Sequence, residues 1–178
     1  MPQRKDLGLL ALRLGVGGVL VAHGTQKLFG WFGGDGLART GESMEAMGFR
    51  PGRTSGLAAG LGEAGGGLLL ALGFATPVAG AAAAGTMAGA VSVHAPAGFF
   101  ATSGGYEFTA LLGCSAAALG ISGPGRYSID HLTCHVLDRP WLIAAAFTTS
   151  ALAAAGVIKR RLSVTAEREL VDEEELLE

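Results

Sequence analysis

The chain has 178 residues, which is the usual length of one domain, and its formal net charge is −2. Charged residues make up 16% of the sequence, against roughly 25% in soluble domains, and Gly together with the hydrophobic residues makes up about two thirds. This composition argues against a soluble helical bundle. The charge balance excludes a basic surface for nucleic acid, and two cysteines are too few for a disulfide framework.

The middle of the chain is nearly free of charge. Between Thr54 and Gly125 there is no Lys or Arg, and the only carboxylates are Glu63 and Glu107. The last 20 residues hold 11 of the 28 charged residues. The long uncharged middle therefore predicts a protein that lies mostly within a membrane.

Five apolar runs approach the roughly 20 residues that a helix needs to cross a bilayer. They are Leu7–His23, Thr54–Phe74, Pro77–Ala95, the shorter Tyr106–Ile121, and Pro140–Ile158.

These runs predict an all-α, polytopic transmembrane helix bundle with a four-helix core and a fifth helix. The core occupies residues 1–131, a connector and the fifth helix occupy 132–161, and an acidic tail occupies 162–178. The first run resembles a signal peptide, but Arg13 interrupts it and no cleavage site follows, so we expect a retained membrane helix.

Small residues recur at spacings of four in the second and third runs. Such faces let membrane helices approach closely, but a Gly and Ala bias of composition explains them equally well, so no helix pair is assigned. The positions are Gly52, Gly56, Gly60, Ala81, Gly85 and Gly89.

The acidic tail has two interpretations. Thr165 can cap a helix that starts at Ala166, with Leu170, Val171, Leu176 and Leu177 on one side; the alternative is a disordered, solvated terminus. If helical, its acidity favours a partner protein over an anionic bilayer.

Helix alternation predicts a shared membrane face for His23, Lys27, His94 and Glu107. Glu63 should lie deeper, roughly 14 Å below Thr54 at about 1.5 Å per residue. Outside the predicted helices, eight Lys and Arg fall on this face and four on the other, which favours the first face as cytoplasmic.

Glu63 is the sharpest single feature, because a charge near the bilayer centre is costly unless it is paired, protonated or hydrated. One interpretation is a protonatable group beside a quinone-like ligand. The other is a structural ion pair with Arg13, which a long arginine side chain would reach from the first helix.

His23 and Lys27 are spaced four apart beside Trp and Phe residues, which fits either donors to a ligand or an aromatic belt at the membrane surface. The segment 94–107 holds a Pro and three Gly, so it must be a loop. Within it, Glu107 either partners Lys27 or caps the following helix, which is the commoner use of such a carboxylate.

Two motifs are discounted. The GxGxxG spacing at 60–65 lacks a preceding strand and an acidic ribose partner. His131, Cys134 and His135 share one helical face, but a polar connector explains them as well as a metal does, so we expect no metal site. Neither Cys134 nor Cys114 belongs to a CxxC motif.

Four motifs occur in order along residues 9–131: HGTQKLFGWFGG at 23–34, GEAGGGLLLALG at 62–73, HAPAGFFATSGGYEF at 94–108 and GPGRYSID at 123–130. Together they resemble the DoxX family of small prokaryotic membrane proteins. The resemblance implies a four-helix membrane core, from which the last 47 residues depart.

Relatives in that family include the membrane subunit of an archaeal thiosulfate:quinone oxidoreductase and a mycobacterial member of a thiol and oxidative-stress assembly. The resemblance implies a multi-pass protein of the inner membrane that is a quinone-linked or redox-associated component of an oxidoreductase assembly. It also implies a protein partner or a homo-oligomer. Quinone is the cofactor that the resemblance implies, and the chain itself contains no cofactor motif. The positions within the matching motifs are His23, Lys27, Glu63, His94 and Glu107.

Two alternatives remain. The protein is a non-catalytic membrane anchor or assembly subunit, or, less favoured because no inverted repeat is visible, a small-molecule transporter.

Overall fold

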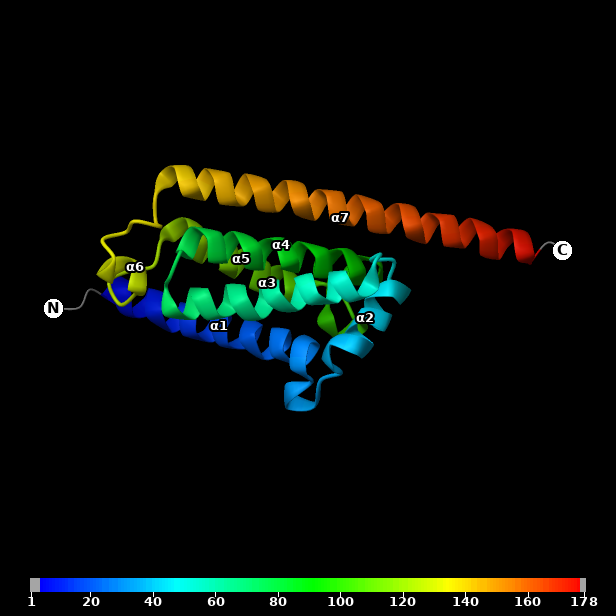
Figure 1. The fold of residues 1–178 in the computed structure, drawn as a ribbon, viewed down its shortest axis with the longest axis horizontal. Helices are drawn as coiled ribbons and strands as arrows, with labels where there is room; N and C mark the ends of the chain where they lie inside the picture. Colours follow the sequence, from blue (N-terminus) through cyan, green and yellow to red (C-terminus); the bar gives the residue numbers. More distant parts are fainter. Residues whose placement is uncertain (1–3, 177–178) are drawn as a thin grey trace.

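The computed structural model describes residues 4–176 and contains only helices in that range, with no strand. Figure 1 shows α1, α3, α4 and α5 side by side, with α7 along one side and α2 and α6 at opposite ends. The elements are α1 (Arg4–Phe29), η1 (Trp31–Gly33), α2 (Gly36–Ala46), α3 (Gly52–Leu72), α4 (Thr76–His94), η2 (Ala95–Ala97), η3 (Ala101–Ser103), α5 (Glu107–Ser122), α6 (Ile129–Leu132) and α7 (Pro140–Glu175).

Four helices of the described chain are long and apolar enough to cross a membrane: α1, α3, α4 with its 3-10 extension, and α7. The fifth apolar helix, α5, has 16 residues and is shorter than a full span. The predicted fold class, an all-α transmembrane bundle with a further helix beyond the core, is confirmed.

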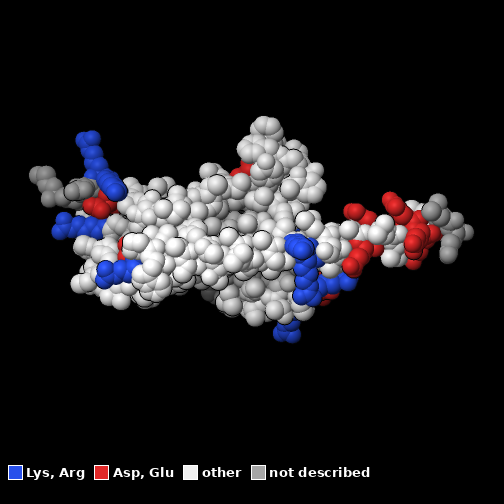
Figure 2. All heavy atoms as spheres, turned by 90° about the horizontal axis from the view of Figure 1, so that it is seen from above, with Lys and Arg blue, Asp and Glu red and all other residues white. Residues whose placement is uncertain are grey.

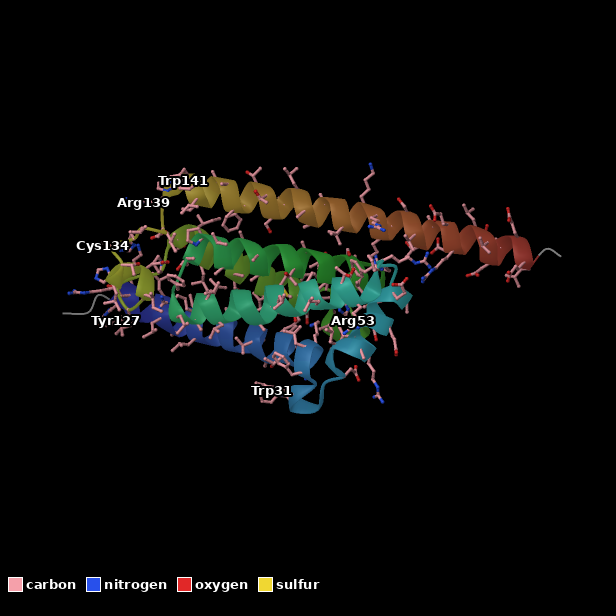
Figure 3. The ribbon with its side chains drawn as sticks, in the orientation of Figure 1. Trp31, Arg53, Tyr127, Cys134, Arg139 and Trp141 are labelled. Atoms are coloured by element: carbon pink, nitrogen blue, oxygen red, sulfur yellow. The ribbon has the colours of Figure 1, made fainter. Side chains whose placement is uncertain are left out.

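Polar groups mark the two ends of this bundle. Figure 2 shows an uncharged belt between a group of Lys and Arg side chains at one end and another where α7 leaves the bundle. In Figure 3, Tyr127, Arg139 and Trp141 lie at the end where the chain begins, and Trp31 and Arg53 lie toward the opposite end. Aromatic and basic side chains favour the two borders of a bilayer, so the belt between them is the membrane-embedded part.

The closest helix pair is α1 and α3, and glycines set its register. A Cβ on Gly17 would collide with Gly67 and Ala71, and one on Gly24 would collide with Gly60 and Ala64. Small residues therefore allow the two antiparallel backbones to touch, as is common in membranes.

The core lies between these helices and α4 and α5. Leu20, Leu70, Ala83, Met87 and Ala116 are among its buried side chains. Against α4 the packing partners are α5, α3 and α7. Because α4 contacts all three, it is the central helix around which the others are placed.

Two helix boundaries differ from the predictions near the first membrane face. The first helix continues beyond His23 to Phe29, and an additional helix, α2, follows it. The range Gly36–Ala46 has no long apolar run, because it is a short surface helix packed mainly on α3. Prediction by apolar length cannot detect such a helix.

The tail differs as well. The predicted start of a new helix at Ala166 is wrong, because α7 continues without a break from Pro140 to Glu175. Thr165 lies inside α7 and donates its hydroxyl to the carbonyls of Arg161 and Leu162. The structure is helical in the tail as far as Glu175. Leu177 lies outside the described residues.

A continuous α7 is about 54 Å long at about 1.5 Å per residue, well beyond a hydrocarbon thickness of roughly 30 Å. Figure 1 shows its C-terminal part projecting past the other helices. Arg168 donates to the carbonyls of Glu45 and Ala46, so α7 is held against the end of α2 before it projects.

Candidate functional site

A cavity of about 720 Å³ opens in the half of the bundle that lies next to α2. Its walls come from α1, α3, α4, α5 and α7, and the turn after α2 contributes Met47 and Phe49. Most of the lining side chains are apolar or small. Its ionisable lining residues are His23, Lys27, Arg50, Glu63, His94 and Arg160.

Glu63 and Lys27 form an ion pair at the wall of this cavity. Lys27 Nζ donates to Glu63 Oε2 at 2.5 Å, and the two side chains are 27% and 4% exposed, respectively. The contact depends on the local fold, because α1 remains helical through Lys27 and packs tightly on α3 at Gly24. A buried carboxylate thus has a cation beside it and an apolar chamber in front of it.

The predicted ion pair between Arg13 and Glu63 is wrong. The glycine contacts of α1 and α3 place Arg13 against Gly73, ten residues along α3 from Glu63, which is about 15 Å. There, Arg13 donates to the carbonyl of Tyr127. The prediction failed because it placed both residues from assumed membrane depths, whereas close glycine packing sets the register.

The two histidines also border the cavity. The imidazole of His23 packs on the ring of Phe108, with centroids 5.8 Å apart. The Nδ1 atom of His94 lies 2.8 Å from the carbonyl oxygen of Gly104, in the loop before α5. Because an oxygen only accepts, His94 carries its proton on Nδ1, which leaves Nε2 free to accept when the ring is neutral.

Glu107 stands apart from the other four predicted residues. It occupies the first turn of α5, where a carboxylate interacts favourably with the helix dipole, and it does not line the cavity. The carboxylate that partners Lys27 is that of Glu63. The structure therefore brings together His23, Lys27, Glu63 and His94 around one cavity and places Glu107 outside it.

A smaller cavity of about 280 Å³ shares His23 and Lys27 with the first one. We call it the vestibule; its remaining lining residues are Gln26, Gly33, Gly34, Asp35 and Thr40. These are polar residues or glycines, in contrast to the apolar lining of the larger cavity. His23 and Lys27 therefore border both a polar space and an apolar one.

Three contributors to the site were not predicted. Phe108 directly follows Glu107 in the sequence. An aromatic side chain next to the predicted loop 94–107 was the feature that could have indicated its role. Arg50 and Arg160 read in the sequence as ordinary basic residues at helix ends. Only the packing of α3 and α7 on α4 brings both to one cavity.

His131, Cys134 and His135 lie in α6 and in the connector that follows it. Among residues 4–176, no group of three His, Cys, Asp or Glu side chains is placed to hold a metal ion. His131 Nδ1 lies 3.4 Å from His135 Nε2, and His135 Nδ1 lies 3.0 Å from Asp138 Oδ2, while Cys134 is exposed. The cluster is a polar connector between α6 and α7.

Comparison with known proteins places the chain. Neither the curated proteins nor the solved structures give a match. Residues 8–96, half of the chain, match the DoxX family model and include His23, Lys27, Glu63 and His94. With four apolar helices of spanning length, the protein is a multi-pass membrane protein. By this match, the chain belongs to the DoxX family.

Proposed function

We propose that the large cavity binds a lipophilic molecule with hydrogen-bond-accepting oxygens, of the quinone class, within an oxidoreductase assembly of the inner membrane. The observation that carries the proposal is the Lys27–Glu63 pair. Its carboxylate is 4% exposed, yet it faces an apolar cavity of about 720 Å³ and is not enclosed by protein. Ionisable groups inside membranes most often mark ligand or proton pathways.

The lining fits such a ligand. Small-molecule sites are typically clefts of roughly 300–1,000 Å³ with apolar walls and a few polar groups that orient the ligand. Here Lys27 supplies an ammonium donor, His23 an imidazole, and Phe108 an aromatic face. Leu20, Met87 and Leu112 add apolar surface to the wall of the same cavity.

The vestibule supports a role in proton movement. It places a polar space against His23 and Lys27, whereas Glu63 faces the apolar cavity. A proton that enters from the aqueous side would reach Glu63 through these two side chains. A quinone, when bound, accepts two electrons and two protons; the residues of this chain hold it and exchange the protons. The electrons come from a redox carrier on a partner protein.

Direct binding tests this proposal. The full-length protein in lipid nanodiscs is irradiated with an azido-quinone, and the labelled peptides are mapped by mass spectrometry. We expect labels on α1 and α3 near His23 and Glu63, competed by unlabelled quinone.

Matched carboxylate variants sharpen the test. Glu63→Gln should lower labelling about tenfold, which is the effect of losing roughly 1.4 kcal/mol of binding free energy. Glu107→Gln, which removes a carboxylate outside the cavity, should leave labelling unchanged. Equal labelling of wild type and Glu63→Gln, or labels spread over the lipid-facing surface, would refute a quinone site here.

A second candidate function, that of a membrane anchor, is favoured by the projecting end of α7. This end carries carboxylates past the bundle, and Leu170 and Val171 are exposed on it. A partner with a basic docking face would complement this surface. Truncation after Arg168 keeps the contacts with α2 and should reduce the size of the native assembly on a blue-native gel. An unchanged size would contradict the anchoring role.

A further inference from the structure

The part of the large cavity formed by α3, α4 and α7 is a slot of its own. At its inner end α7 touches α4, because Ser150 Oγ donates to the carbonyl of Ala81 at 2.6 Å. At its outer end Arg161 Nη1 donates to the carbonyl of Ser92 at 3.0 Å. Between these two contacts the facing surfaces of α3, α4 and α7 line the cavity.

The walls of this slot are small side chains. Ala58 of α3, Ala90 of α4 and Ala153 of α7 line it, and a Cβ on Gly89 would meet no atom within 4 Å. Ala58 and Ala153 are exposed, so the slot opens sideways into the hydrocarbon of the membrane. From Ser150 to Arg160 it extends about 15 Å, roughly the hydrocarbon thickness of one leaflet.

Positive charge lines the outer end of the slot. Arg50 forms an ion pair with Glu45 at 3.2 Å, and among the described residues Arg160 has no carboxylate partner. Lys27, deeper in the cavity, is neutralised by Glu63. Figure 2 shows basic side chains where α7 leaves the bundle, which is the level of lipid headgroups.

We propose that this slot is a binding site for an anionic phospholipid. One acyl chain lies in the slot along Gly89 and Ala153, and the phosphate lies against Arg160 and Arg50. The arrangement matches both halves of such a lipid, since an apolar slot of one leaflet's depth ends at basic side chains. Basic pockets between membrane helices commonly bind anionic headgroups. The lipid occupies the part of the cavity beside α7, whereas the ligand of the proposed function occupies the inner part at Lys27 and Glu63.

Native mass spectrometry of the full-length protein tests the proposal. The protein is loaded in mixtures of phosphatidylglycerol and phosphatidylcholine, and the lipids that stay bound are counted. We expect one retained phosphatidylglycerol, in preference to phosphatidylcholine. An excess of inorganic phosphate should not displace it, because the acyl chain contributes to binding; displacement would show a simple anion site and overturn the proposal.

Two pairs of variants separate the slot from general surface properties. Arg160→Gln should lower phosphatidylglycerol retention about fivefold, which corresponds to about 1 kcal/mol per basic residue, whereas Lys159→Gln should have little effect. Gly89→Leu should fill the slot and abolish retention. Gly156 also has no atom within 4 Å of a Cβ, but it does not line the cavity. The Gly156→Leu variant should therefore retain the lipid.

The outcomes that overturn the proposal are distinct. Equal losses in Arg160→Gln and Lys159→Gln would show diffuse surface attraction. Undiminished retention in Gly89→Leu would place the lipid elsewhere. Thermal unfolding of each variant in detergent shows that it is folded, and a retained inner ligand site is checked separately by quinone labelling.

Discussion

Each end of the bundle holds a buried acidic side chain beside a basic one, but the surroundings of the two pairs differ. At the end where the chain begins, Arg13 and Asp130 are both fully buried. Asp130 accepts hydrogen bonds from the backbone of Ala75 and from the backbone and hydroxyl of Thr76. At the other end, Glu63 accepts one from Lys27 and borders an open cavity.

This difference separates a structural polar cluster from a candidate functional one. Around Arg13 there is no spare volume, since a Cβ on Gly73 would collide with its guanidinium. The carboxylate of Asp130 caps the start of α4 and lies near Arg13. Protein groups therefore already occupy the hydrogen-bond-accepting positions of this carboxylate. Glu63 keeps capacity and space for a ligand. Burial of charge alone therefore does not identify a site; burial next to free volume does.

The largest expected effect on the free energy of unfolding is at the end of the bundle that holds Arg13 and Asp130. Asp130→Ala leaves three donors without an acceptor and Arg13 without its nearest carboxylate, so we expect a loss of about 3–5 kcal/mol in the free energy of unfolding. Thermal or denaturant unfolding in detergent measures it. The exposed Asp35→Ala variant is the control. In an Arg13→Met background the loss should shrink; an undiminished loss would disprove the coupling between the two residues.

The register of α1 and α3 is tested next, because it decides which basic residue meets Glu63. Gly17→Val forces a side chain against Gly67 and should cost about 1–3 kcal/mol. The neighbouring Gly18→Val meets no atom within 4 Å and carries the same change in helix propensity. The difference between the two variants in unfolding free energy isolates the helix contact. Equal stabilities would contradict the register.

The smallest expected effect on stability is at the candidate site. Glu63→Gln removes one contact between membrane helices, which is worth about 0.6 kcal/mol on average, and Lys27 stays solvated through the vestibule. Asp130→Asn makes the same carboxylate-to-amide change and should destabilise more. The comparison uses unfolding midpoints in one detergent. A greater loss in Glu63→Gln would make the Lys27–Glu63 pair the structural one.

Much of the fold was predictable, because the requirement for apolar length in a membrane acts on sequence directly. The runs Thr54–Phe74 and Pro77–Ala95 differ from α3 and α4 by at most two residues at each end. Helix alternation also anticipated that His23, Lys27 and His94 would lie near Glu63. Motifs far apart in sequence were grouped because successive spanning helices reverse direction.

Other features had no local signal. The helix α2 lacks an apolar run of spanning length and depends on packing against α3. The continuation of α7 past Thr165 was missed because Thr165 was interpreted as the N-terminal cap of a new helix, whereas it lies inside α7. Glu107 was placed on the correct side of the bundle, but only the orientation of α5 decides that it stays outside the cavity.

By itself, the sequence determined that the chain is an all-α membrane protein with few charges in its middle, since composition and apolar length decide how a chain partitions into lipid. Tertiary structure alone decided that Lys27, and not Arg13, pairs with Glu63. It also decided that Arg50 and Arg160 share one cavity. The physical reason is that register between helices depends on backbone contact at glycines such as Gly17 and Gly24, which no single helix specifies.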